Sequence, residues 1–308
     1  MFNIKSFYTF LVVAVSVVTF ISCKKEKPLN PKGLEESYIM TPGTTAADKF
    51  RYDFFQKYGT KILFEFHPKE YYYTPTNALD SNDKIRYITN PATHERALRY
   101  VNYHWLQFYP SDFKQEYLPL YILLTDRLVD HINRVTSTAD SIKYAKSNGF
   151  ASILIAGLGS RFDTMSTGTK ARLRAEVHLQ FLYNYLYLGQ RLKIPDEFFE
   201  ASAPFYFTSR TTPLAADYSD YGPAGFVKPA PGSGNPSGFP TRGEDLNMYL
   251  KFIIESDQAT VDAYINPTAH ANVKKKYNIL VNYFNSLGVN LRSIHSTDPE
   301  LAGSLTNF

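Results

Sequence analysis

Histidines are the first residues to consider for chemistry, because they are the commonest metal ligands and carry protons near neutral pH. The chain of 308 residues has seven: His67, His94, His104, His131, His178, His270 and His295. The zinc-peptidase motif H-E-x-x-H places two histidines four residues apart on one helix face, and its glutamate activates the metal-bound water. No two of these histidines are four residues apart. The sequence therefore contains neither H-E-x-x-H nor the inverted motif H-x-x-E-H.

Two segments match part of that motif. His94 and Glu95 begin it, but Leu98 stands where the second histidine would be, so this segment is interpreted as an exposed helical face. Glu176 and His178 are two residues apart, which places their side chains about 200° apart on a helix and prevents joint chelation. His178 is interpreted as a histidine satisfied within the packing of its helix, and a position lining a groove is the alternative.

Acidic residues offer weaker candidates. Glu244 and Asp245 are the best adjacent carboxylates, and the competing interpretation is a helix N-terminus, where acids are favoured by the helix dipole. Asp126, Asp130 and His131 could bind a cation, but an ordinary solvated helix face is preferred. No G-x-S-x-G, P-loop or dinucleotide fingerprint is present. Paired carboxylates of a glycoside hydrolase leave no sequence mark and stay open.

The N-terminal segment predicts export and lipidation. Residues 6–22 carry no charge and are mostly apolar, which suits the h-region of a signal peptide but is short for a membrane-spanning helix. The run ends in Phe20-Ile21-Ser22-Cys23, which resembles a bacterial lipobox, and Cys23 is the only cysteine. We expect a lipoprotein signal peptide at 1–22 and a lipid on Cys23 that anchors the chain to the outer membrane, on its periplasmic face or at the cell surface. An ordinary signal peptide that happens to contain a cysteine is the alternative.

Composition describes a globular remainder. Hydrophobic residues make up 44% and charged residues 20%, and the net charge of +4 is too small to indicate a nucleic-acid partner. Tyrosine (24) and phenylalanine (23) are abundant; they fill a half-buried core or contact sugars and peptides at a surface. Residues 23–45 are predicted to be a flexible tether, and 46–308 a single domain.

Periodicity predicts the elements that position these residues. The order of helices and strands indicates an α+β fold rather than an alternating α/β fold. Residues 203–243 hold seven prolines and six glycines and predict a long loop. The sequence predicts helices at 46–58, 91–109, 170–192, 243–255, 258–265 and 268–287, strands at 60–66, 118–124 and 150–156, a short element at 195–201 and a loop at 67–90.

Several blocks, in order, resemble a known family. The sequence is similar to the zinc-binding metallopeptidase lipoproteins, also called substrate import-associated zinc metallohydrolase lipoproteins. The similarity extends over most of residues 50–293, and no block is by itself a chemical motif. The blocks are 58–66 (YGTKILFEF), 113–124 (FKQEYLPLYILL), 194–198 (IPDEF), 225–227 (GFV) with 244–246 (EDL), and 276–284 (KYNILVNYF) with 289–292 (VNLR).

The resemblance implies a zincin-like fold with a twisted mixed sheet, a long helix and a mainly helical C-terminal half. It also implies H-E-x-x-H on the long helix, where this chain has Leu182, Tyr183 and Leu186 instead. The family's later acidic block ends in glutamate, where this chain has Met248. Leucine and methionine cannot replace these zinc ligands. We therefore expect a degenerate member without zinc or another cofactor.

These observations predict a non-catalytic lipoprotein that serves an outer-membrane uptake system and binds a glycan or a peptide. The uptake context is implied by the family resemblance alone. The predicted groove is formed by Glu176, His178, Tyr183, Tyr187, Glu244 and Asp245. Two alternatives stay open: a hydrolase that uses an unrecognised site, and a scaffold that remains with an outer-membrane receptor.

Overall fold

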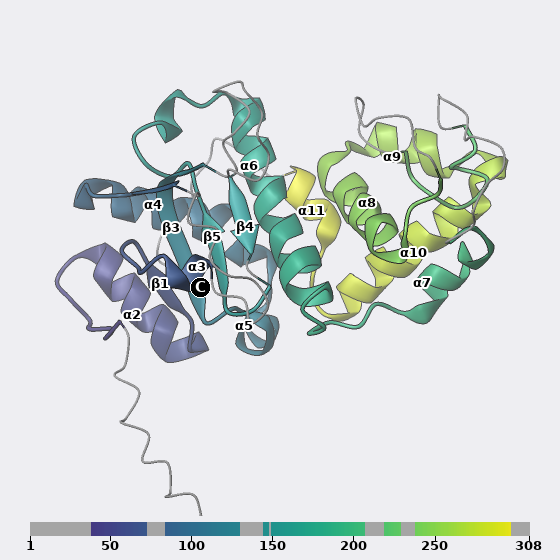
Figure 1. The fold of residues 1–308 in the computed structure, drawn as a ribbon. Helices are drawn as coiled ribbons and strands as arrows, with labels where there is room; N and C mark the ends of the chain where they lie inside the picture. The colour runs from purple at the N-terminus through teal and green to yellow at the C-terminus, as the bar shows by residue number, and fades with distance from the viewer. Residues whose placement is uncertain are drawn as a thin grey trace, which may run out of the picture. The chain divides into compact units, whose positions relative to one another are not determined.

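The computed structural model describes residues 38–72, 84–129, 144–147, 149–206, 219–228 and 238–296 (Figure 1). Cys23, the predicted signal peptide, Asp130 and His131 lie outside the described residues. The chain divides into two units, Met1–Ile39 and Met40–Phe308. All described residues from Met40 onward belong to the second unit. In the described part of the chain, no helix is long and apolar enough to cross a membrane.

A mixed sheet forms the first half of this unit (Figure 1). Among the described residues, its strands follow the order β1-β3-β5-β4, and β2 pairs with β3. The central strands β1, β3 and β5 are parallel to one another, whereas β2 and β4 are antiparallel to their neighbours. The strands are β1 (Lys61–Leu63), β2 (Lys84–Tyr87), β3 (Tyr121–Val129), β4 (Ala145–Ser147) and β5 (Ser152–Ile155).

Helices accompany this sheet. Helix α2 begins where Thr45 accepts a hydrogen bond from the Asp48 amide, and it ends at Gly59, whose φ of 70° suits glycine. Residues 67–90, predicted as a loop, contain α3 and β2, and β2 is held by antiparallel pairing with β3, a long-range partner that the local sequence does not reveal. The helices and 3₁₀ turns are α2 (Ala46–Tyr58), α3 (Lys69–Tyr72), α4 (Pro91–His104), η1 (Leu106–Phe108), α5 (Ser111–Tyr117) and η2 (Phe162–Thr164).

The predicted long helix has two parts with different geometry. Helix α6 (Thr167–Leu179) begins at Ser166, which caps the Thr169 amide. It continues as η3 (Gln180–Tyr187), a π-helical segment in which the Leu188 amide donates to the Tyr183 carbonyl, five residues back. Ring pairs form along this wider turn, with centroids 6.1 Å apart for Phe181–Tyr185 and 5.8 Å apart for Tyr183–Tyr187. π-helical turns of this kind are frequent at functional sites.

The C-terminal half is mainly helical, as predicted. Gly288 follows α10 with a φ of 76°, and the Val289 amide donates to the Phe284 carbonyl, so the helix ends in a Schellman-type turn. Helix α11 was not predicted, and it packs against α8. The elements are α7 (Asp196–Glu200), η4 (Ala203–Phe205), α8 (Arg242–Glu255), α9 (Gln258–Ile265), η5 (Thr268–His270), α10 (Ala271–Ser286) and α11 (Leu291–Ser296).

The expected fold class is confirmed. The described chain is α+β, with a mixed sheet and a helical C-terminal half. Strands β1 and β5 are buried along their whole length, as is typical of parallel strands whose two faces are both covered.

Candidate functional site

The six residues predicted to form a groove separate into two places. Glu176 and His178 belong to α6 and face the sheet half. Tyr183, Tyr187, Glu244 and Asp245 lie around the start of α8 instead, so the candidate site is built there.

His178 is completely buried, and both of its ring nitrogens have partners. Its Nδ1 lies 2.7 Å from the Tyr109 hydroxyl, and its Nε2 lies 3.0 Å from the His104 carbonyl. A carbonyl can only accept, so Nε2 carries the proton and Nδ1 accepts from Tyr109. Burial lowers the pKa of His178 to about 3, which keeps the imidazole neutral. This side chain is held by the core and has no access to a groove.

Glu176 points elsewhere, because its Oε1 accepts a hydrogen bond of 3.2 Å from the Ala145 amide of β4. Glu176 and His178 therefore point in different directions, as predicted for residues that are two apart on a helix. His94 is half-buried and not fully exposed: its ring stacks on Phe64 at 3.8 Å, and its Nε2 lies 3.1 Å from the Ile88 carbonyl. Asp126 lies within β3 and forms an ion pair with Arg86.

The positions implied for zinc ligands do not fit the ion. Leu182 and Leu186 are 1% and 0% exposed and belong to the hydrophobic core. Met248 is half-buried and lines a hollow beside α8. None of these side chains offers a ligand that zinc prefers. Within the described ranges, no three His, Cys, Asp or Glu side chains gather closely enough to hold a metal.

The start of α8 is fixed by a capping box. The Thr241 side chain accepts from the Glu244 amide, and the Glu244 carboxylate accepts from the Thr241 amide at 2.8 Å. Gly243 lies directly beneath Tyr183, because a Cβ at that glycine would come within 2.9 Å of the Tyr183 hydroxyl. A larger residue at position 243 would therefore have to displace the Tyr183 side chain.

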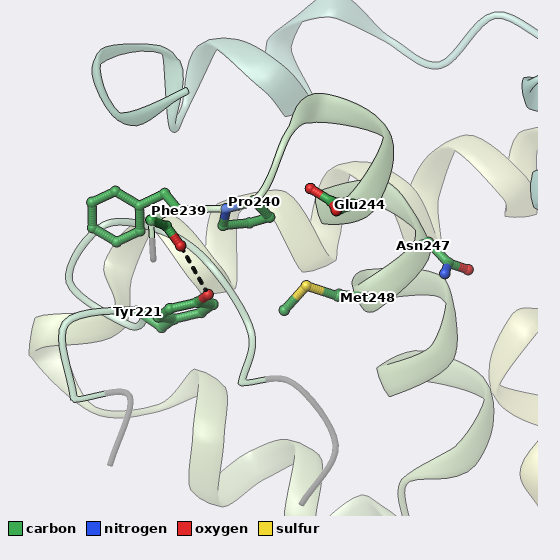
Figure 2. A pocket seen from close by; sticks show the side chains of 7 residues that line it. Tyr221, Phe239, Pro240, Glu244, Asn247 and Met248 are labelled. Carbon is green, nitrogen blue, oxygen red and sulfur yellow. Dashed lines mark hydrogen bonds between the residues drawn. The ribbon is translucent and has the colours of Figure 1, made fainter. Parts of the chain in front are cut away.

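Two hollows flank this first turn of α8. One has a volume of about 400 Å³ and is lined by Tyr221, Phe239, Pro240, Glu244, Asn247 and Met248, together with Gly238. Figure 2 shows Glu244 and Met248 extending from α8 toward the side of Tyr221 and Pro240. The Tyr221 hydroxyl donates to the Gly238 carbonyl at 3.5 Å, which holds the aromatic wall in place.

The second hollow has a volume of about 300 Å³. Arg242 and Glu244 are two residues apart and therefore face opposite sides of the helix, so the two hollows lie on either side of the first turn. Both volumes are at the lower end of those of small-ligand pockets, and both combine aromatic rings with a few charged groups. The second hollow is lined by Tyr187, Gln190, Leu192, Lys193, Ile194, Asp196, Phe199 and Arg242.

Asp245 turns inward from this turn and is completely buried. Its Oδ2 lies 2.5 Å from the Lys276 Nζ of α10 and also accepts a hydrogen bond from the Tyr206 hydroxyl. The Nζ donates a second bond, of 3.1 Å, to the Ser202 hydroxyl. Glu244 and Asp245 therefore do not act together as a carboxylate pair, because the first caps the helix and the second holds a buried cation.

Aromatic rings enclose the Lys276 ammonium. The Nζ lies 4.6, 4.7 and 4.8 Å from the ring centroids of Phe198, Tyr249 and Phe226. Burial lowers the pKa of Lys276 to about 8 and raises the pKa of Asp245 to about 6, while the attraction between the two opposes both shifts. The site is a charged pair in an apolar, water-excluding box.

Sequence reasoning missed Lys276, Tyr206 and Ser202. Lys276 lies within the lysine run 274–276, which is typical of a solvated helix face. A signal was nevertheless present, because Lys276 shares the helical spacing of the buried residues Val273 and Leu280.

Comparisons with known proteins show the fold. No family model matches the sequence, and no curated protein matches it. A solved structure from Bacteroides caccae ATCC 43185, described as a "putative zinc-binding metallo-peptidase", is similar with a TM-score of 0.50 and 15% sequence identity. The similarity covers 82% of this chain and 92% of that chain. At this identity the similarity establishes architecture alone, so the chain has a metallopeptidase-like α+β fold.

Proposed function

We propose that this protein is a membrane-anchored lipoprotein that uses a metallopeptidase-like fold to bind a glycan or a peptide, without zinc-dependent hydrolysis. Cys23 carries the lipid in this proposal, and the protein serves an outer-membrane nutrient-uptake system from the periplasmic face or the cell surface. The observation that carries the loss of hydrolysis is the apolar burial of Leu182 and Leu186, the two positions where the resemblance implies histidines.

Binding is supported by the hollows beside α8. Their walls combine aromatic faces, such as Tyr187 and Tyr221, with polar groups such as Arg242 and Asn247. Aromatic faces pack against sugar rings and apolar side chains, while the polar groups fix orientation. Because the two hollows adjoin one turn of helix, an extended ligand that spans Thr241 and Gly243 can occupy both.

Zinc binding tests the proposed loss of the metal site. We expect calorimetric titration of the full-length chain in detergent to show no stoichiometric zinc binding. We also expect no turnover in panels of peptidase and glycosidase substrates. Stoichiometric zinc binding with micromolar or tighter affinity would contradict the proposal. Turnover that is abolished by Glu244→Gln would favour the alternative, a hydrolase that uses an unrecognised site.

Ligand arrays test binding. The full-length chain is screened against oligosaccharides and peptides, and binding is confirmed by a ligand-dependent rise in melting temperature. We expect Tyr187→Ala and Tyr221→Ala to weaken binding at least tenfold. Tyr283→Ala is the matched control, because Tyr283 is a half-buried tyrosine of α10 that lines neither hollow. Equal loss in all three variants, or no ligand in either array, would count against the binding role.

The location is tested separately. We expect labelled fatty acid to be incorporated into the wild-type chain and not into Cys23→Ser, which should also leave the membrane fraction. Protease treatment of intact cells distinguishes the cell surface from the periplasmic face. Recovery of Cys23→Ser in the membrane fraction would contradict the lipid anchor and leave the ligand-binding proposal standing.

A further inference from the structure

The Lys276–Asp245 pair differs from an ordinary buried ion pair in one respect. Asp245 has two carboxylate oxygens, and only Oδ2 is engaged, by Lys276 and Tyr206. The other oxygen, Oδ1, is buried and has no hydrogen-bond partner among the described residues. Two charges in an apolar box repay their desolvation only when the remaining lone pairs are satisfied. As an ion pair, this site therefore leaves an oxygen uncompensated.

The surroundings meet the chemical requirements for joining these two groups covalently. Nζ contacts the Asp245 carboxyl group, and both side chains are excluded from water, being 0% and 1% exposed. A low-dielectric site disfavours the two charges, so proton transfer from Nζ to the Asp245 carboxylate yields a neutral amine and a neutral carboxylic acid. The opposed pKa shifts of Lys276 and Asp245 are in the direction of this exchange.

We propose that Lys276 and Asp245 condense to an intramolecular isopeptide bond that joins α10 to α8. The neutral amine attacks the carboxyl carbon Cγ, a C–N bond forms, and the Cγ–Oδ1 bond breaks. Oδ1 leaves as water, taking the proton that the carboxylate accepted from Nζ and one of the two amine protons. The second amine proton remains on the amide nitrogen, so no oxidant or other reagent is needed.

Two neighbours have defined positions in this reaction. The Tyr206 hydroxyl donates to Oδ2, the oxygen that is retained, and so stabilises the negative charge that develops there during attack. The Ser202 hydroxyl, 3.1 Å from Nζ, accepts the N–H that the amide keeps. Ser202 in turn donates to the Ala224 carbonyl at 3.0 Å, which fixes its orientation. The product removes the unpartnered oxygen and both buried charges.

Peptide mapping tests the bond directly. Trypsin normally cleaves after Arg242 and Lys251, and also after Lys275, Lys276 and Arg292. It cannot cleave after an acylated lysine. We expect the wild-type full-length chain, denatured in urea before digestion, to yield peptide 243–251 linked to peptide 276–292. The linked pair should weigh one water molecule less than the two peptides together, and free peptide 277–292 should be absent.

Two variants serve as controls. Lys276→Arg keeps the positive charge but removes the amine that attacks, and Asp245→Ala removes the carboxyl carbon. We expect the linked peptides to disappear in both variants. Recovery of free peptides 243–251 and 277–292 from the wild-type chain would overturn the proposal, even if neither variant folds. Persistence of a linked pair in Lys276→Arg would also overturn it, because the bond would then involve another residue.

Discussion

The two halves of the described chain each bury ionisable groups completely, and they do so in opposite ways. In the sheet half, His178 is neutral and forms one hydrogen bond with each ring nitrogen. In the helical half, Lys276 and Asp245 face each other inside a box of aromatic rings, either as an ion pair or joined by the proposed amide bond. Both sites are inaccessible, but only in the second does the loss of one partner leave a buried charge.

The two sites therefore differ in the free energy of unfolding that a single substitution should remove. A neutral buried group needs only matched donors and acceptors, and each such hydrogen bond contributes about 1 kcal/mol net. A buried charge without its partner is far more expensive, because the protein interior cannot solvate it. The helical half should therefore be the more vulnerable of the two to a single substitution.

Lys276→Met should have the largest effect. It leaves the Asp245 carboxyl group buried without a cation or an amide link, which costs about 3–5 kcal/mol. Urea unfolding followed by circular dichroism measures the loss. The double variant Lys276→Met/Asp245→Leu should recover most of it, because the aromatic box then encloses apolar side chains. A loss below about 1 kcal/mol in the single variant would show that water or another cation reaches Asp245.

His178→Phe should have a smaller effect, because it removes hydrogen bonds and no charge. The Tyr109 hydroxyl loses its acceptor, and an unsatisfied buried group of this kind costs about 1–3 kcal/mol. The double variant Tyr109→Phe/His178→Phe should be more stable than His178→Phe alone. If the double variant is less stable by the sum of the two single losses, the two side chains act independently and the comparison fails.

The pH dependence of the free energy of unfolding should be set by His178, in the sheet half. The unfolded chain protonates His178 near its ordinary pKa of 6.5, whereas the folded chain resists protonation until about pH 3. Unfolding therefore takes up a proton between these values, and stability falls as the pH is lowered through this window. An unlinked Asp245, with its pKa raised to about 6 from 3.8, would give the opposite slope as the pH rises from about 3.8 to 6.

The isopeptide bond makes these slopes distinguishable. A condensed pair does not titrate, so wild-type stability should show the His178 slope without the opposing contribution of Asp245. His178→Phe should flatten the curve between pH 3 and 6.5. Melting temperatures across this range measure both. A wild-type curve that is flat between about pH 4 and 6, where the two contributions would cancel, would show that Asp245 titrates freely.

The sequence predicted local features well and long-range partners poorly. The bounds predicted for helix α2, residues 46–58, follow from neighbouring residues, and the structure confirms them. The π-helical geometry of η3 was not predicted, because the apolar spacing of residues 170–192 indicates a helix without distinguishing π from α turns. The partnership of Asp245 with Lys276 joins residues far apart in the chain, so it became visible only when α8 and α10 were packed together.

The smallest expected effect concerns the caps of two helices, one in each half. Thr241→Ala and Ser166→Ala should each cost roughly 1 kcal/mol, because each removes the acceptor for an amide of the first helical turn. Only Thr241→Ala also frees the Glu244 carboxylate, which lines the larger hollow. We therefore expect amide hydrogen exchange to rise in residues 242–245 for Thr241→Ala, with weaker ligand binding. Ser166→Ala should raise exchange only at the start of α6. If Thr241→Ala and Ser166→Ala change ligand binding equally, the hollows beside α8 are not the binding site. Loss of a cap would then have the same effect on binding in both halves of the chain.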